Sequence, residues 1–475
     1  MRVLYVTSEA YPFCKTGGLA DVAGSLPPAL AAEGVETAVI LPLYDKIGPQ
    51  WREKMTFRRY IYVDLGWRHE YCGLFSLYDR GVTWYFVDNE KYFRRGRLYG
   101  EFDDGERFAF FSKAVVDLLP SLDWMPDILH CNDWQTALVP IYLKDAATRW
   151  WEIRHIRTVF TIHNIEYQGR YGSDSVDQLF GLDRGWYDDG TLRMDGDVNL
   201  MKGAMLMADA VTTVSPTYAA QLHDPAYAEG LESVVDAIGW KMHGVVNGID
   251  TEGYYPASDP PLPAHYTPED MGGKAACKSS LQGALWLHQE PDTPLIAMVT
   301  RLVGHKGLDL VQQAMDGIMA AGCQFVVLGT GDGQYEDFFR WKAGQYPGRL
   351  SAQILYAEDL SRRIYAAADL FLMPSRSEPC GLSQMIAMRY GAVPIVRSTG
   401  GLADTVRSCQ VGQEDGTGYL FGDYDAGAML SVIGQATGLY RGDRAGFDTV
   451  RYRGMTADFS WGRSAAAYRH IYENL

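Results

Sequence analysis

Short runs of apolar residues alternate along the chain with segments whose apolar residues recur every three or four positions. The runs are typical of strands buried on both faces, and the second pattern is typical of helices that cover a sheet. In the first half, strands are predicted at residues 3–7, 37–41, 128–131, 158–162 and 210–214. In the second half, they are predicted at residues 295–299, 324–328, 353–355, 370–373 and 393–396. This alternation predicts α/β units with parallel sheets.

Helical spacing is clearest in three places. The apolar stripes consist of Phe108, Phe111, Val115 and Leu118, of Leu308, Val311, Met315 and Ile318, and of Trp461, Ala465, Tyr468 and Tyr472. The last stripe predicts a helix that closes the chain. Residues 57–87 alternate with a period of two instead, which predicts an antiparallel insertion of hairpin type.

The pattern restarts after the middle of the chain, as expected for two domains in 475 residues. A stretch rich in proline and other turn formers, residues 256–268, separates the two halves. We therefore expect a first domain at residues 1–246, a second at 247–455 and a final helix at 456–475.

Composition narrows the possible partners. The formal net charge of −16 argues against nucleic acid, which needs an excess of Lys and Arg. We find no signal-peptide pattern at the start and no apolar run long enough to span a bilayer, so no membrane partner is expected. Seven scattered cysteines without a CxxC pair indicate reduced thiols and a cytoplasmic location.

One hexapeptide, TGGLAD, occurs twice, at residues 16–21 and 399–404. Each copy lies between a predicted strand and a predicted helix, where bare glycine amides and the helix dipole favour an anion. Lys15 precedes the first copy. A single Gly-Gly pair is most often an ordinary turn, but two copies in matching places favour anion sites.

Arg301 and Lys306 follow the predicted strand 295–299, at the edge where open α/β sheets bind ligands. Two cations there would neutralise a departing diphosphate, although two solvated surface charges are the alternative. Glu378 lies in the loop PSRSEPCGLSQ, residues 374–384, after another predicted strand. Its carboxylate either binds sugar hydroxyls or caps the next helix.

Other polar residues also follow predicted strands. Asp133 and Trp134 follow one strand, and His163 and Asn164 follow another, so they are expected at the same edge, with a structural histidine as the alternative. The sequence GTGDG at residues 329–333 lacks the full dinucleotide fingerprint. Residues 195–197, Asp-Gly-Asp, have no supporting ligands and are interpreted as a loop, so no metal is expected.

Together these segments resemble the bacterial glycogen synthase and plant starch synthase family over essentially the whole chain. The match runs through KTGGLADVAGSLP from Lys15, HCNDWQTALVP from His130, FTIHNIEYQG from Phe160, TVSPTY from Thr213, VVNGID from Val245, TRLVGHKGLDL from Thr300, PSRSEPCGLSQMIAMRYG from Pro374 and STGGLADTV from Ser398. The resemblance implies a GT-B fold, two Rossmann-like domains with a central cleft, and a last helix that crosses back to the first domain. The first domain would be the acceptor side, and the second would hold the nucleotide-sugar donor.

The resemblance also implies roles for individual residues. The catalytic residues would be Glu378, His163, Arg301, Lys306 and Asp133. Donor binding would fall to Lys15, Gly18, Arg301, Lys306, Tyr356, Cys380, Gly381, Leu382, Thr399, Gly400 and Gly401, with Tyr356 stacking on the base. Further cleft residues would be Asp21, Asn164, Lys202 and Asn247.

The implied reaction is retaining transfer of glucose to the 4-hydroxyl end of an α-1,4-glucan, without a cofactor. Animal and fungal synthases place a second Glu eight positions after the first, where this chain has Ile386. This difference favours ADP-glucose as donor, with UDP-glucose as the alternative. The oligomeric state stays open.

Three other functions fit parts of the pattern. A nucleotide-sugar 2-epimerase has similar halves but needs no glucan. A carbohydrate-binding scaffold would not need Lys15, Arg301, Lys306 and Glu378, and all four are present. An NAD dehydrogenase would need a complete GxGxxG after a strand, which the chain lacks.

Overall fold

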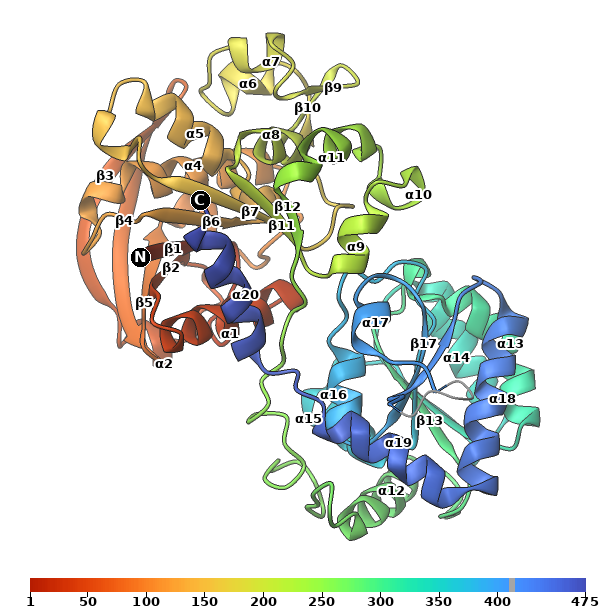
Figure 1. Cartoon of the computed structure of the whole chain (residues 1–475). Coiled ribbons are helices and arrows are strands. Elements are labelled where there is room, and N and C mark those ends of the chain that lie inside the picture. Colours follow the sequence, from red (N-terminus) through yellow and green to blue (C-terminus); the bar gives the residue numbers. More distant parts are fainter. Residues whose placement is uncertain (410–414) are drawn as a thin grey trace. The chain divides into compact units, whose positions relative to one another are not determined.

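The computed structural model describes residues 1–409 and 415–475. The chain forms two compact units. Unit 1 comprises Met1–Gly248 and Trp461–Leu475, and unit 2 comprises Ile249–Ser460. Both units are α/β structures built around a sheet of mainly parallel strands (Figure 1).

The main sheet of unit 1 has nine strands in the order β12-β11-β7-β6-β1-β2-β5-β4-β3. Their bounds are β1 (Arg2–Val6), β2 (Glu36–Pro42), β3 (Thr56–Leu65), β4 (Arg68–Asp79), β5 (Val82–Asp88), β6 (Ile128–Asn132), β7 (Arg157–Ile162), β11 (Ala210–Thr213) and β12 (Met242–Gly244). The strands from β12 to β5 pair in parallel. The central strands β1 and β6 are almost wholly buried, which explains their continuous apolar sequences.

The segment predicted as an antiparallel insertion is continuous with this sheet. Strands β3 and β4 pair antiparallel, and so do β4 and β5, as expected from the period of two. Strand β5, however, also pairs in parallel with β2. The hairpin therefore extends the main sheet instead of forming a separate layer.

Unit 1 has five longer helices among its described residues. They are α1 (Gly18–Ala32), α4 (Asp104–Asp117), α5 (Leu138–Ala147), α8 (Leu200–Met207) and α20 (Trp461–Glu473). Helices α1 and α4 contact strands of the sheet. Shorter helices include α9 (Pro216–Gln221) and α11 (Glu232–Ile238), and a small sheet consists of β8 (Arg170–Tyr171), β9 (Arg193–Met194) and β10 (Asp197–Asn199).

The last helix of the chain belongs to unit 1. Helix α20 lies beside α1, at the opposite end of the sequence (Figure 1). The hydroxyl of Tyr472 lies 2.6 Å from Nδ1 of the buried His130, and the hydroxyl of Ser464 donates to the carbonyl of Val246 at 2.6 Å. The predicted apolar stripe is buried, with Trp461, Ala465, Tyr468 and Tyr472 all inside unit 1.

Unit 2 has a parallel sheet of six strands in the order β15-β14-β13-β16-β17-β18. The strands are β13 (Leu295–Val299), β14 (Gln324–Leu328), β15 (Leu350–Gln353), β16 (Leu370–Met373), β17 (Val393–Arg397) and β18 (Tyr419–Phe421). The strand predicted at residues 353–355 is wrong in position, because β15 ends at Gln353. This edge strand has one neighbour and carries polar residues, so the apolar pair that follows it misled the prediction.

The helices of unit 2 are α12 (Gly272–Ala284), α13 (Leu308–Ala320), α14 (Gly333–Gln345), α15 (Glu358–Ala367), α16 (Ser383–Arg389), α17 (Gly400–Thr405), α18 (Ala426–Gly442) and α19 (Arg444–Thr456). The predicted stripe of α13 is buried: Leu308, Val311, Met315 and Ile318 belong to one core cluster with residues of β13, β14 and α18, and α13 contacts α18. Within the described residues no helix combines the length and the apolar character needed to cross a bilayer.

Candidate active site

The sheet of unit 2 brings together three loops predicted to bind ligand. Strands β14, β13, β16 and β17 are neighbours and parallel, so their carboxyl ends lie along one edge. Lys306 follows β13, Glu378 follows β16, and Gly400 follows β17. The topology therefore places predicted site residues from distant parts of the chain on neighbouring loops.

Lys306 and Glu378 form a bidentate ion pair. The Nζ atom of Lys306 lies 2.9 Å from Oε1 and 2.7 Å from Oε2 of Glu378, and the Ser375 hydroxyl donates to Oε2 at 3.0 Å. The two side chains are 15% and 8% exposed, so water screens their attraction only weakly. Glu378 therefore fixes the position of the lysine charge and does not act as a simple helix cap.

Gly307 and Gly400 allow these loops to approach one another. Gly307 has a positive φ of 74°, and a Cβ atom there would lie 2.0 Å from the carbonyl oxygen of Pro374. Gly400 has a φ of 45°, and its Cβ atom would lie 2.0 Å from the carbonyl oxygen of Glu378. No larger residue fits either position without moving the Glu378 loop.

The second TGGLAD turn differs in one respect from the expected anion site. The N–H of Gly401 donates to the carbonyl oxygens of Glu378 and Pro379, both at 3.1 Å. A Cβ atom on Gly401 would lie 2.2 Å from the carbonyl oxygen of Cys380. The amide of Gly401 therefore donates to the protein backbone in this structure, and its role in donor binding stays a prediction.

Gln384 and Ser375 support the Glu378 loop, and neither residue has a distinctive pattern in the sequence. The side chain of Gln384 donates to the carbonyls of Cys380 at 3.1 Å and Gly381 at 3.0 Å, and to the Thr405 hydroxyl at 3.0 Å. Gly381 itself has a φ of 73°. The motif PSRSEPCGLSQ identified this loop in the sequence, but it did not indicate which side chains hold the loop in place.

The remaining predicted donor residues of unit 2 differ in exposure. Arg301 is exposed, and Tyr356 is 79% exposed in the loop after β15. Thr399 is buried at the start of α17, and Leu382 is the residue that precedes α16. An exposed aromatic ring without a packing role is suited to stacking on a planar base.

The first TGGLAD turn, in unit 1, is held by a buried carboxylate that sequence reasoning missed. Oε2 of Glu9 accepts hydrogen bonds from the backbone N–H of Thr16 at 2.6 Å and from its hydroxyl at 2.7 Å. Burial raises the pKa of Glu9 to about 7. Lys15 forms an ion pair with Asp21 at 2.7 Å, and Gly18 is the first residue of α1.

Asp133 and His163 are adjacent at the carboxyl ends of β6 and β7. Oδ1 of Asp133 accepts a hydrogen bond from the backbone N–H of His163 at 2.8 Å, and the Asn164 backbone N–H also bonds to this carboxylate. Burial raises the pKa of Asp133 to about 7 and lowers the pKa of His163 to about 3. Asp133 has a φ of 56°, a strained conformation often found at functional positions.

The contacts of Asn132 determine which ring nitrogen of His163 carries the proton. The Asn132 amide nitrogen donates to the carbonyl of Val6 at 2.9 Å, which fixes Oδ1 as the acceptor on the other side. Oδ1 accepts from the Tyr5 hydroxyl at 2.8 Å and lies 2.9 Å from Nε2 of His163. Nε2 of the neutral imidazole therefore carries the proton, and Nδ1 is left as an acceptor.

Two other predicted residues have different surroundings. Nζ of Lys202 donates to the carbonyls of Gly190 at 2.9 Å and Arg193 at 2.6 Å, so it holds a loop of unit 1. Asn247 is buried, and its Oδ1 has no hydrogen-bond partner among the described residues. A buried acceptor of this kind is consistent with a ligand contact.

The Asp-Gly-Asp segment is a tight turn, as predicted. Asp195 and Gly196 have positive φ values of 52° and 86° and connect β9 to β10. Asp195 forms an ion pair with Arg170 at 3.2 Å. Over residues 1–409 and 415–475, no group of three or more His, Cys, Asp or Glu residues has a geometry that could hold a metal ion.

Comparison with known proteins identifies the family to which these two sets of loops belong. Residues 2–237 match the model of the starch synthase catalytic domain, and residues 287–436 match that of the glycosyl transferases group 1. The chain is 46% identical over 475 residues to a glycogen synthase of Streptococcus equi subsp. zooepidemicus, with all of both chains covered. The chain belongs to the glycogen and starch synthase family. It is therefore a glycosyltransferase.

Other relatives agree with this assignment. A glycogen synthase of Geobacillus stearothermophilus is 45% identical over 100% of this chain and 98% of its own. The catalytic domain of starch synthase IV from Arabidopsis thaliana, solved with ADP and acarbose, matches with a TM-score of 0.92 and 34% identity over 99% of this chain and 98% of that one. The predicted GT-B fold is confirmed by this match. Sucrose-phosphate synthase from Thermosynechococcus elongatus, at 18% identity and a TM-score of 0.60, shares the fold.

Proposed function

We propose that this enzyme transfers glucose from ADP-glucose to the non-reducing 4-hydroxyl end of an α-1,4-glucan, with retention of configuration and release of ADP. Full-length relatives named glycogen synthase, and a starch synthase neighbour solved with ADP, support this proposal. The single observation that carries it is the shielded Lys306–Glu378 pair at the carboxyl edge of the unit 2 sheet. It presents a fixed cation where a diphosphate would develop charge.

In this proposal unit 2 binds the donor and unit 1 binds the acceptor. Lys306 and Arg301 hold the diphosphate, and Tyr356 stacks on the adenine. The backbone from Cys380 to Leu382 holds the glucose together with Glu378. Because Lys306 is fixed by its bidentate contact, its charge is already oriented when the phosphate leaves.

The residues of unit 1 act on the sugar hydroxyls. His163 is neutral at physiological pH because its pKa is about 3, so it does not serve as a general acid. Its unprotonated Nδ1 can accept a hydrogen bond from a hydroxyl of the transferred glucose. In unit 1 the amine of Lys15, which precedes α1, is held by Asp21.

We propose a front-face displacement. The bond between the anomeric carbon and the phosphate oxygen breaks, and the acceptor 4-oxygen forms its bond to the same face of that carbon. The proton of the 4-hydroxyl passes to the departing phosphate, whose charge Lys306 and Arg301 stabilise. No covalent nucleophile and no cofactor are required by this sequence of steps.

A cytoplasmic location is also proposed, because the seven cysteines are free thiols and six of them are buried. The donor base is tested by measuring kcat and KM with ADP-glucose and UDP-glucose on one glycogen primer. ADP-glucose is expected to give the higher kcat/KM. A higher kcat/KM with UDP-glucose would contradict the choice of base while leaving the glucosyl transfer itself intact.

A further inference from the structure

A cavity of about 450 Å³ lies at the amino end of the unit 2 sheet, opposite the loops of the candidate active site. Its walls come from α12, from the segment before β13, from the segment before β16 and from the junction of α18 and α19. Its volume lies within the range of small-molecule sites. None of the residues discussed for glucosyl transfer lines it.

The cavity carries an excess of positive charge. Its lining includes four cationic side chains and two carboxylates, namely Lys274, Lys278, Arg444, Arg451, Asp369 and Asp448. This local balance is opposite in sign to the net charge of the chain, which is −16. It favours an anionic ligand over a neutral or cationic one.

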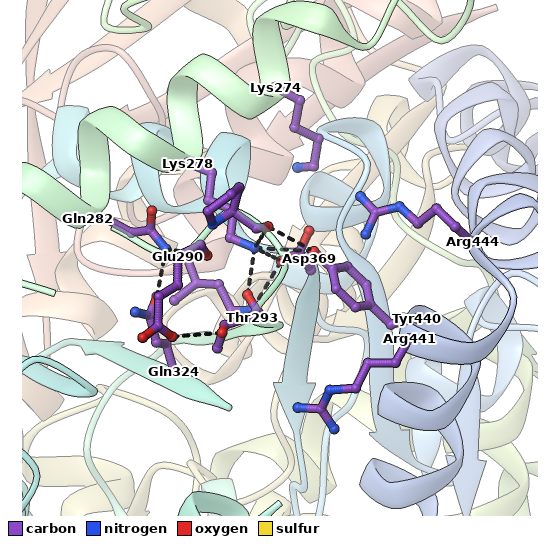
Figure 2. Close-up of polar contacts among 12 residues, drawn as sticks. Lys274, Lys278, Gln282, Glu290, Thr293, Gln324, Asp369, Tyr440, Arg441 and Arg444 are labelled. Atoms are coloured by element: carbon purple, nitrogen blue, oxygen red, sulfur yellow. Dashed lines mark hydrogen bonds and ion pairs between the residues drawn. The ribbon is translucent and has the colours of Figure 1, made fainter. Parts of the chain in front are cut away.

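The two lysines that line the cavity are almost wholly buried. Nζ of Lys278 contacts Oδ2 of Asp369 at 2.7 Å and the Tyr440 hydroxyl at 3.2 Å (Figure 2). Nζ of Lys274 contacts only carbonyl oxygens among its hydrogen-bond partners, including Ala366 at 2.9 Å and Tyr390 at 2.8 Å. Among the described residues Lys274 therefore has no carboxylate within ion-pair distance, and burial lowers its pKa well below the usual value.

The carbonyl partners of Lys274 explain part of its position. Ala366 lies in the last turn of α15, and Tyr390 directly follows α16, so the ammonium group satisfies carbonyls at two helix ends. These partial negative charges compensate the lysine only in part. A purely structural role would account for the two lysines, but not for the arginine donors at the same cavity.

Two arginines leave hydrogen-bond donors for a ligand. The Nε of Arg451 is buried and has no partner in the described part of the chain, although its other nitrogens contact Asp448 at 2.8 Å and Asp369 at 3.4 Å. Arg444 is exposed, its Nε lies 3.6 Å from Oδ1 of Asp448, and its guanidinium lies 4.2 Å from the centre of the Tyr440 ring. Figure 2 shows the Arg444 side chain extending from α19 toward Lys274 and Asp369.

We propose that this cavity binds a phosphate dianion, either free or as the phosphate group of a small metabolite. The shared chemistry is a compact group with several acceptor oxygens, which suits a guanidinium fork and an unpaired N–H donor. The site is separate from the donor site, and the proposal does not depend on the transfer reaction. Among the residues that would bind the phosphate, Arg444 is best suited to a test by substitution, because its side chain is exposed.

The test is the thermal unfolding midpoint of the full chain, measured with increasing inorganic phosphate and with sodium chloride at matched ionic strength. A second series uses glycerol 3-phosphate in place of inorganic phosphate. The compound that raises the unfolding midpoint at the lower concentration shows whether the cavity prefers free phosphate or a phosphate ester. A saturable, phosphate-specific rise is expected. In Arg444→Ala the apparent affinity should fall about tenfold, as for the loss of a charged hydrogen bond.

Two variants provide controls. Arg441→Ala removes the same charge three residues earlier, but the Arg441 guanidinium donates to the carbonyls of Ala321 and Gly322 and does not line the cavity. Lys306→Ala alters the proposed donor site. Both should keep the phosphate effect of the wild type.

The proposal is overturned if neither ligand stabilises the chain beyond chloride, which would mean that only water occupies the cavity. It is also overturned if the effect disappears in Lys306→Ala and persists in Arg444→Ala, since phosphate would then bind at the donor site. The measurement is repeated with Arg444→Gln, which removes the charge but keeps a long polar side chain. A similar loss of affinity in both variants shows that the effect comes from the charge and not from lost packing.

Discussion

Lys306 and Glu378 lie 72 positions apart in the chain, yet Nζ of the lysine contacts both carboxylate oxygens, at 2.9 Å and 2.7 Å. The contact exists because β13 and β16 are parallel neighbours and each residue is in the loop that follows its strand. A glycine with a positive φ, Gly307, brings the two loops together. The pair therefore connects the topology of the sheet directly to the chemistry that the loops support.

We expect this pair to act as one unit in turnover. Lys306→Ala should lower kcat about 100-fold with a smaller change in donor KM, because its charge matters most as the phosphate leaves. Glu378→Gln should have a similar effect, since it releases the lysine. The double variant should lose little more than either single one, as expected for coupled residues.

The Lys342–Asp316 pair is a matched control for this cycle. It also joins a buried lysine to a carboxylate in unit 2, at 2.6 Å, but between α14 and α13. Lys342→Ala should change stability and leave kcat unaltered. Full turnover in Lys306→Ala with only weaker donor binding, or multiplicative losses in the double variant, would contradict the assigned role.

Gly400 should tolerate no side chain. In Gly400→Ala the new Cβ atom would lie 2.0 Å from the carbonyl oxygen of Glu378, so the Glu378 loop must move or the backbone at residue 400 must become strained. We expect a loss of about 2 to 4 kcal/mol in the free energy of unfolding, together with reduced activity. Gly434→Ala is the control, because its exposed position in α18 has no neighbouring atom within 4 Å of the Cβ and should be neutral or stabilising. Equal stability of the two variants in urea denaturation would refute the packing argument.

Much of the fold was predictable because parallel strands are buried on both faces. Strands β13, β14 and β16 were predicted with their observed bounds, as each is a continuous apolar run between turn formers. Strand β15 was misplaced because Ser351 and Gln353 interrupt its apolar pattern at the sheet edge. Strands β5 and β2 pair although they are far apart in the sequence, and local periodicity does not indicate such a pairing.

The sequence predicted which loops form the candidate site, but it did not predict which side chains contact one another there. The motifs identified the loops of Glu378, Lys306 and His163, since charged and polar residues after strands mark the ligand edge. The roles of Glu9 and Asn132 were missed, because a buried Glu and a buried Asn have no distinctive local pattern. Only the tertiary structure shows that they hold Thr16 and His163.

Glu9 should make stability depend on pH. Its pKa in the folded chain is about 7, above the value of 4.5 for an unperturbed side chain, so the folded state binds more protons between these values. The contribution of Glu9 to the free energy of unfolding therefore falls as the pH rises from about 4.5 to about 7, and stays low above that. Glu9→Gln keeps an acceptor for Thr16 without ionising. Its stability relative to the wild type should thus rise across this window.

The measurement is urea denaturation of both proteins from pH 5 to pH 8. Glu53→Gln, an exposed position in the same unit, is the control and should track the wild type. A constant difference between Glu9→Gln and the wild type over the whole range would show that Glu9 does not titrate within it.

Asn132 should act through His163. Asn132→Ala removes the acceptor for the Nε2–H of His163, so the ring loses its fixed orientation, and kcat should fall about tenfold or more. Tyr5→Phe removes the other donor to the same oxygen and keeps the His163 contact, so its kcat should stay near that of the wild type. Thermal unfolding of each variant shows whether it is folded at the assay temperature. Equal losses in both variants would assign Asn132 a purely structural role.

The central claim is glucosyl transfer to a glucan, and the most direct measurement follows the label from ADP-[14C]glucose in the presence of glycogen. The proposal predicts that label becomes insoluble in ethanol with the polymer and is released as maltose by β-amylase, which cleaves α-1,4 linkages from the non-reducing end. Lys306→Ala should abolish most of this incorporation. Label recovered only as free or epimerised sugar, with none in the polymer, would contradict the proposal.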